Sequence, residues 1–196
     1  MNKFTIALAF FTMAAFAASA QTYSGNMMVG GGLEFWSRSY QGGNSNDGSE
    51  ISFTPGFGYF VSDNFAVGSS LLISSERQGT GSNKTIYSSF GLAPFARYYK
   101  FTSNEKFGFF GEAEFSFATY KTDPPVGDVT KGNQIRFSLS PGAVFFFNEH
   151  WAVEFMVTGF AVTSTDPDKD EDDDKRTTVE FGLNSLQPSL GFRYHF

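Results

Sequence analysis

Seven charged side chains stand alone among apolar and small residues, and they are the first candidates for chemistry. They are Glu34, Arg97, Glu112, Glu114, Arg136, Glu154 and Arg193. An arginine can hold a carboxylate through two hydrogen bonds, because its planar guanidinium group matches the carboxylate geometry. Since the glutamates and arginines are nearly equal in number, we expect them to form a network of ion pairs.

A second candidate is the acidic run 166–174, whose carboxylates could supply oxygen ligands to a calcium ion. An EF-hand loop that began at Asp166 would need glycine at position 171 and glutamate at position 177. Glu171 and Thr177 occupy these positions. We therefore expect a solvated loop, and weak contact with divalent cations is the alternative.

The two histidines of the chain, His150 and His195, do not belong to a recognisable catalytic or metal-binding pattern. The sequence has no cysteine, no Gly-rich phosphate loop before a helix and no Cys/His spacing typical of a metal site. It therefore predicts no catalytic residue, no cofactor and no metal ion, and we expect that the protein is not an enzyme.

The segments that carry the isolated charges alternate between two kinds of side chain. In 107–117 the odd positions are mostly phenylalanine, whereas the even positions include Glu112, Glu114 and Ser116. A period of two places these sets on opposite faces of a β-strand. The same pattern predicts eight strands, at roughly 27–39, 50–61, 65–75, 85–99, 106–120, 134–147, 150–163 and 178–196.

The connections between these strands alternate in length, as they do in transmembrane barrels. The short ones are 62–64, 100–105 and 148–149, and the longer, polar ones are 40–49, 76–84, 121–133 and 164–177. The predicted fold is all-β: an eight-stranded antiparallel up-and-down transmembrane β-barrel.

Four prolines repeat at equivalent places, each with an aromatic residue four positions later: Pro55, Pro94, Pro141 and Pro188. The repeat indicates one hairpin used four times. Because proline deletes a hydrogen bond of the ladder, its place inside a barrel strand is a difficulty, and the sequence alone does not decide whether a bulge absorbs it. A break in the alternation predicts a further bulge near 184–186.

The N-terminus reads as a signal peptide over 1–20, with Lys3, an apolar run and Ala18-Ser19-Ala20 before the expected cleavage point. The barrel domain would then be 21–196. The net charge of −6 disfavours nucleic acid as a partner. No later apolar run is long enough for a membrane-spanning helix.

The two faces of the predicted strands distinguish a membrane barrel from a soluble sandwich. One face is apolar and uncharged, as a lipid-facing surface should be. The other holds the seven charges among glycines and serines and no lysine, which suits the narrow interior of an eight-stranded barrel. Aromatic residues that favour membrane boundaries are expected near the strand ends: Trp36, Tyr59, Tyr98, Tyr99, Trp151 and Tyr194.

Three fragments make the whole predicted domain resemble a known family: Pro55–Phe60, Pro94–Tyr99 and the closing Phe192–Phe196. The family is that of small outer-membrane β-barrel proteins, which includes the OmpA membrane domain, OmpX and the outer membrane protein beta-barrel domain group. The resemblance implies a place in the bacterial outer membrane among its lipid and lipopolysaccharide. It also implies that Phe196 acts as an assembly signal for the barrel-assembly machinery. The chain lacks the peptidoglycan-binding domain of full OmpA, so a cell-wall tether is not expected.

Three functions follow as hypotheses. The first is a structural or surface-interaction protein, monomeric because a closed barrel has no open strand edge, with the Arg/Glu network as a plug. The second is a narrow, porin-like channel for small solutes, with the same network as its lining. The third and least favoured is a lipid-modifying enzyme.

Overall fold

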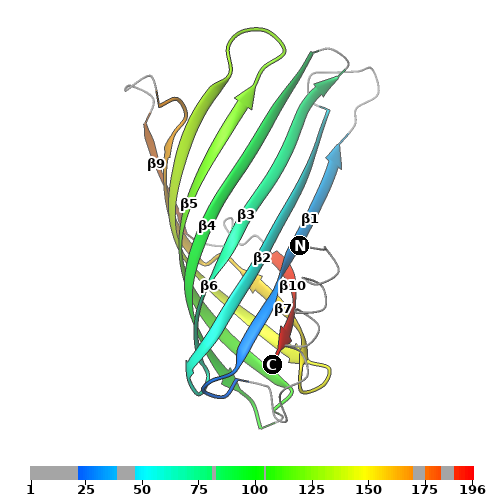
Figure 1. Ribbon diagram of the computed structural model, residues 1–196, viewed down its shortest axis with the longest axis vertical. Coiled ribbons are helices and arrows are strands. Elements are labelled where there is room, and N and C mark those ends of the chain that lie inside the picture. Colours follow the sequence, from blue (N-terminus) through cyan, green and yellow to red (C-terminus); the bar gives the residue numbers. More distant parts are fainter. Residues whose placement is uncertain (1–21, 39–46, 81–82, 104, 170–174, 182–187) are drawn as a thin grey trace, which may run out of the picture.

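The computed structural model describes residues 22–38, 47–80, 83–103, 105–169, 175–181 and 188–196. These residues form one antiparallel sheet that curls into a barrel (Figure 1). Its strands are β1 (Met27–Arg38), β2 (Gly48–Ser62), β3 (Phe65–Thr80), β4 (Asn83–Phe101), β5 (Phe107–Asp123), β6 (Thr130–Phe146), β7 (Trp151–Val157), β8 (Phe160–Asp166), β9 (Arg176–Phe181) and β10 (Pro188–His195). The predicted fold class is confirmed.

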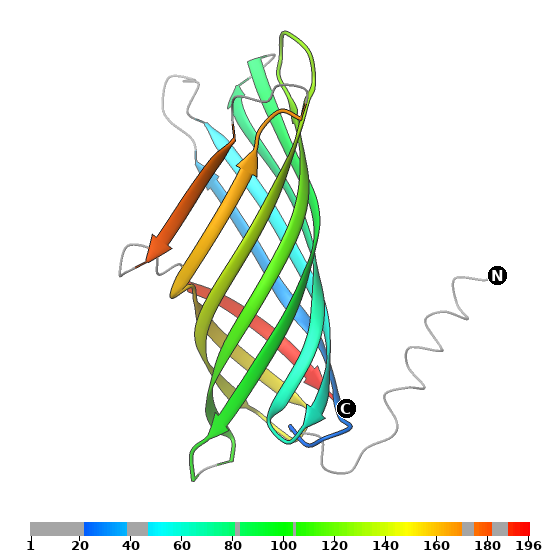
Figure 2. The same cartoon turned by 90° about the vertical axis from the view of Figure 1, so that its left-hand side faces the viewer.

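Eight of these strands close a ring in the lower half of the barrel, as it is oriented in Figures 1 and 2. Strands β1 to β7 follow one another around the wall, and β10 closes it by pairing with both β7 and β1. In this half lie the short turns, such as the one around Asn64, whose left-handed backbone (φ 63°) suits asparagine.

The seventh predicted strand is divided in two. The lower part of β6 pairs with β7, from Gly142 to Phe146, and its upper part pairs with β8, from Asn133 to Leu139. Between these two ladders, three residues of the segment that joins β7 to β8 lie opposite two residues of β6. The extra residue makes a bulge. The bulge lies opposite Pro141, which has no N–H to donate, and the Gly159 N–H donates to the Leu139 carbonyl at 3.0 Å.

Two other prolines lie within their strands without a change of register. Pro55 is paired with Gly31 of β1, and Pro94 with Ser69 of β3. On its other side each strand skips two pairs and then resumes the same register. These two positions have no bulge, because two skipped pairs are enough to accommodate the missing N–H.

The eighth predicted strand is also divided, into β9 and β10. The bulge predicted near 184–186 and the predicted signal peptide 1–20 both lie outside the described residues. Strand β9 pairs with β8, whereas β10 pairs with β7 and β1. The two halves of this predicted strand thus join different parts of the wall.

The upper half of the described barrel has an open seam as a result. The pairing of β1 with β10 ends at Gly32, and Leu33–Arg38 pair with β2 alone among the described residues. Strand β9 is the edge of the sheet, beside β8 (Figure 2). The expectation of a monomer stays a prediction.

The strands also extend further at the upper end than predicted. Strands β3 and β4 stay paired up to Thr80 and Asn83, and β5 and β6 up to Thr122 and Thr130. Most of the predicted loops 76–84 and 121–133 is therefore strand. Polar residues on both faces conceal the alternation there, although the backbone still forms the ladder.

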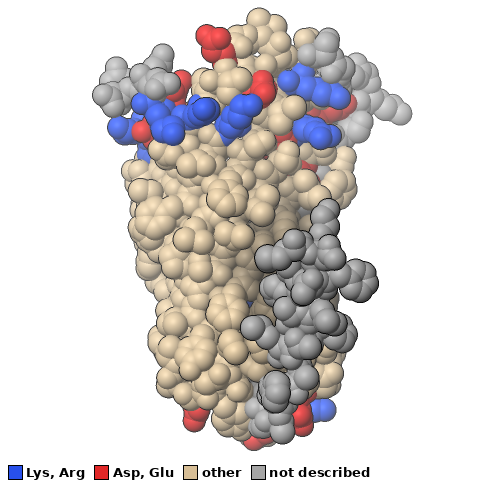
Figure 3. All heavy atoms as spheres, viewed as in Figure 1, with Lys and Arg blue, Asp and Glu red and all other residues tan. Residues whose placement is uncertain are grey.

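The outer wall carries a broad apolar belt. Exposed side chains of every long strand contribute to it, including Phe57, Ile73, Phe90, Phe117, Phe137 and Phe192. Figure 3 shows one face of the belt, with charged residues gathered mainly above it and a few below. A patch far larger than a few hundred Å² marks a surface that contacts a membrane or a partner. The described residues contain no helix long and apolar enough to cross a membrane.

Candidate functional site: the lower lumen

Four of the predicted charges meet inside the lower half of the barrel. Arg97 of β4 contacts Glu112 of β5, with Nη2 and Oε2 2.6 Å apart, and Glu154 of β7, with Nη1 and Oε2 2.7 Å apart. Arg193 of β10 reaches the same Glu154 oxygen from the other side, at 2.6 Å from Nε. All four side chains are buried, and we call them the ionic layer.

The strand alternation explains why these groups converge. Arg97 and Glu112 are directly opposite each other on neighbouring strands, so they share a face. Glu154 and Arg193 point inward from β7 and β10, across the lumen. Burial of a charge is costly unless it is paired and hydrogen-bonded, and here each cation has a carboxylate partner.

Tyr99 belongs to this interior and not to the membrane boundary, which corrects the prediction for it. Its side chain is fully buried, and its hydroxyl donates to Glu154 Oε1 at 3.1 Å. The same hydroxyl accepts a hydrogen bond from Arg97 Nη1 at 3.1 Å. The reason is positional: Tyr99 lies two residues from Arg97 and therefore on the same face of β4.

An aromatic layer lies directly below the ionic layer. Phe110 and His195 are each two residues nearer the lower end of their strands than Glu112 and Arg193. Together with Phe60, Phe146 and Tyr99 they pack ring against ring, at centroid distances of 4.9 to 5.8 Å. The Phe110 ring also lies 4.3 Å from the Arg97 guanidinium carbon, so the two layers are in contact.

A cavity of about 300 Å³ lies on top of the ionic layer. Its floor contains Arg97, Glu112, Glu154 and Arg193, and Glu114 lines it too. Its walls include Thr54, Ser70, Met156 and Ser189, and residues 31–32 and 190–191 line it where the pairing of β1 with β10 ends. No ring of the aromatic layer lines this cavity. The five rings are buried and packed against one another below the ionic layer, so side chains fill the described lower lumen.

Arg136, another of the predicted charges, lies away from this cavity. Arg136 is in the upper half, where its Nη1 contacts Glu180 Oε2 at 3.2 Å and donates to Thr163 Oγ1 at 3.3 Å. Glu180 was not among the predicted residues, because the pairing of β6, β8 and β9 that brings it close could not be read from the sequence. The side chains of Glu34 and Trp36 lie outside the described part of the chain.

The other boundary aromatics lie on the outer wall near the lower end. Tyr59, Tyr98 and Trp151 are exposed, and the ring of Tyr194 lies 5.0 Å from that of Trp151. Phe196, at the C-terminus, exchanges two backbone hydrogen bonds with Met27. These bonds fix the end of the chain against β1, while a role of Phe196 in assembly stays a prediction.

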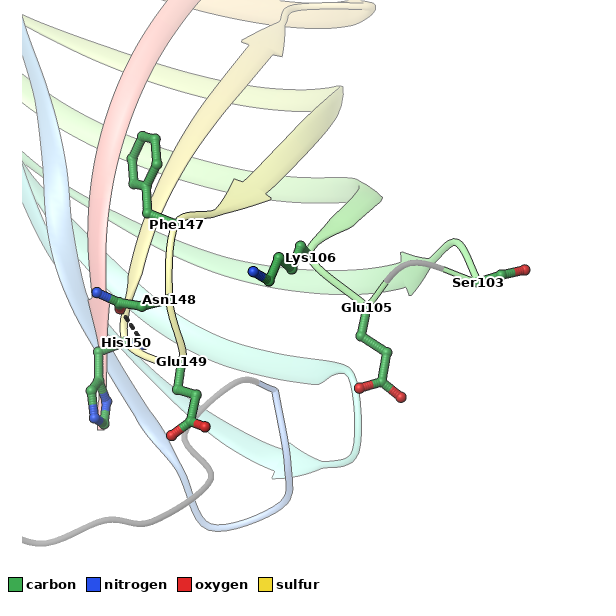
Figure 4. Close-up of a pocket in the computed structure, with 7 residues that line it drawn as sticks. All are labelled: Ser103, Glu105, Lys106, Phe147, Asn148, Glu149 and His150. Carbon is green, nitrogen blue, oxygen red and sulfur yellow. Dashed lines mark hydrogen bonds between the residues drawn. The ribbon is translucent and has the colours of Figure 1, made fainter.

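A second depression, of about 800 Å³, lies between the two lower turns 102–106 and 147–150 (Figure 4). Asn148 organises the second turn, since its Oδ1 accepts hydrogen bonds from the backbone N–H groups of His150 and Trp151. In Figure 4 the carboxylates of Glu105 and Glu149 extend side by side from separate turns without facing each other, and the Ser103 hydroxyl points away from both. Because these polar groups do not converge, the depression is a gap between turns and not a candidate active site.

The closed ring, the apolar outer belt and the polar interior together define a transmembrane β-barrel. Residues 4–185 match the outer membrane protein beta-barrel domain family, and the chain belongs to that family. Its members are proteins of the bacterial outer membrane, in which the short turns lie on the periplasmic side. The lower end of the barrel is accordingly its periplasmic end.

Three solved structures are similar to this chain. The N-terminal β-barrel domain of Pseudomonas aeruginosa OprF is 11% identical, with a TM-score of 0.43 over 88% of this chain and 98% of that one. Neisserial surface protein A is 12% identical, with a TM-score of 0.49 over 88% and 98%. OprG from Pseudomonas aeruginosa is 15% identical, with a TM-score of 0.46 over 90% and 98%. No curated relative matches the chain.

Proposed function

We propose that this protein is a structural, non-conducting barrel of the outer membrane, exported by its predicted signal peptide, whose outer end meets the cell's surroundings. The observation that carries the proposal is that two layers of side chains, the ionic layer and the aromatic layer, fill the lower lumen one below the other. A solute that entered from outside would meet the buried ion pairs of Arg97 and Glu154 and then a layer of packed rings.

Separating these two layers would cost free energy. Parting the ion pairs would leave charges buried without partners, which costs several kcal/mol in a protein interior. The rings below would then have to separate and lose their packing. Thermal motion of side chains alone is therefore not expected to produce a continuous water path.

The experiment is conductance of the refolded full chain in planar lipid bilayers. We expect no stable channels. As a positive control, the variant Phe60→Ala/Tyr99→Ala/Phe146→Ala removes three rings of the aromatic layer and should give small, flickering currents if it folds. Stable channels of nanosiemens size in the unaltered protein would overturn the proposal.

A second candidate function is uptake of a small polar solute into the upper lumen. The cavity on the ionic layer and the open seam beside Gly32 favour it. Release to the periplasm would require both layers to move. Liposome swelling with sugars and amino acids of increasing size distinguishes the two functions, since only the second predicts any entry.

A further inference from the structure

We propose that Lys121, Lys131 and Lys169 form a site on the outer wall that binds the phosphate of an outer-leaflet lipopolysaccharide lipid. The proposal rests on the membrane position of the barrel and does not depend on the closed lumen. The three lysines line a depression of about 370 Å³ together with Ser88, Phe90, Thr119 and the neighbouring backbone.

The strand register places two of the lysines side by side. Lys121 of β5 and Lys131 of β6 are directly opposite each other. Both share the outward face of their strands with exposed apolar residues, Phe117 in β5 and Ile135 in β6. A backbone hydrogen bond holds the third lysine beside Lys131, because the Lys169 N–H donates to the Lys131 carbonyl at 3.0 Å.

This arrangement is electrostatically unfavourable without an anion. Like charges that face each other across two strands destabilise the pair. One carboxylate compensates in part, since Asp123 Oδ2 lies 3.2 Å from Lys121 Nζ. Within the described ranges no carboxylate forms an ion pair with Lys131 or Lys169. Two of the three positive charges therefore have no carboxylate partner there.

The surface below the lysines identifies the anion as a lipid. On the same outward face, Phe90 and Leu92 of β4, Phe117 of β5 and Ile135 of β6 are exposed. They continue into the apolar belt, so the cations stand at its outer boundary. A molecule with a phosphate and acyl chains would satisfy both parts, while the long lysine stems can lie along its apolar portion.

A phosphate fits this site better than a carboxylate partner. Three ammonium groups on separate segments are point charges that can surround a tetrahedral group without a fixed planar geometry. The Ser88 hydroxyl adds a possible donor, because Ser88 is directly opposite Lys121 on β4. Asp123 neutralises one of the three positive charges, and a phosphate with up to two negative charges would balance the other two.

The test is native mass spectrometry of the full chain in detergent, titrated with bis-phosphorylated lipid A. Lys121→Gln/Lys131→Gln/Lys169→Gln should weaken binding roughly a hundredfold, and each single change about fivefold. The corresponding triple arginine variant should still bind. Folding of each variant is checked by its shift on gels before and after boiling.

A matched control changes the net charge equally at other places. Lys84 lies near the upper end of β4 and does not line the depression, and Lys100 and Lys106 lie at the periplasmic end. Their triple glutamine variant should bind lipid A like the unaltered protein. Dephosphorylated lipid A should bind much more weakly than the phosphorylated form.

Three results would overturn the site: undiminished binding by the first variant, equal loss in the control variant, or equal binding of dephosphorylated lipid A. If the first variant fails to fold, the single Lys131→Gln variant and the two lipids decide. Channels in the bilayer experiment would contradict the proposed function alone and leave this site standing.

Discussion

The lower and upper halves of the barrel are built from the same strands, but they are closed in different ways. In the lower half eight strands form a complete ring around buried ion pairs and packed rings. In the upper half the described wall ends at β9 on one side and at β1 on the other. The comparison teaches that the hydrogen-bonded ladder of one β-barrel can run all the way around one end, while at the other end two of its described strands pair on one side alone.

The contrast extends to the charges. Arg97 and Glu154 are almost completely buried, whereas Arg136 and Glu180 are about a quarter to a third exposed. A buried pair is costly to break, and an exposed pair is screened by water and contributes little. The same two residue types therefore have different consequences in the two halves.

Hydrogen exchange should separate the halves most strongly. We expect the amides of β9 and of Leu33–Arg38 to exchange more than about a hundredfold faster than those of Met28–Gly32, because edges open locally while the ring opens only with global unfolding. Exchange measured by mass spectrometry in lipid nanodiscs tests this. Equal protection of both parts of β1 would show that the seam is closed in the membrane.

The next largest effect is expected from Glu154→Ala. It leaves Arg97 without one of its two carboxylate partners and Arg193 without its ion pair, so the free energy of unfolding should fall by about 3–5 kcal/mol. Urea unfolding followed by tryptophan fluorescence in lipid vesicles measures it. The matched change Glu180→Ala in the upper half should cost less than about 1 kcal/mol. Similar losses for both would refute the contrast.

A glycine pair tests the packing of the aromatic layer. A Cβ on Gly142 would lie 2.3 Å from Phe110 Cζ, so Gly142→Ala should cost about 1–3 kcal/mol through overpacking. Gly111, on the neighbouring strand, has no atom within 4 Å of such a Cβ. Gly111→Ala should therefore leave stability nearly unchanged, and the same urea titration compares the two. An equal loss at both positions would contradict the close packing at Phe110.

The smallest expected effect is that of Tyr99→Phe. The ring stays in place, while Glu154 and Arg97 each lose one hydrogen bond to the hydroxyl. The loss should be about 1–2 kcal/mol. A double variant with Glu154→Ala should lose less than the sum of the single changes, because both act on one network. Strict additivity would place Tyr99 outside the network.

Much of the fold could be predicted from the period of two. In 107–117 it assigns Phe115 and Phe117 to one face and Glu112 and Ser116 to the other, and the structure has them on the outer and inner faces. The same rule applied to Arg97 would have placed Tyr99 inside. The prediction that Tyr99 lies at the membrane boundary is wrong because the alternation outweighs the preference of tyrosine for such boundaries at this position.

What the sequence by itself determined is the face of each strand, since alternation is a local property of the backbone. Only the tertiary structure decided which distant strands meet: Arg97 and Glu154 are separated by 57 positions, and Glu180 reaches Arg136 through β8. It also decided that β10, and not β9, closes the ring with β1. The physical reason is that the pairing of distant strands depends on how the whole wall closes, and a local sequence pattern contains no information about that closure.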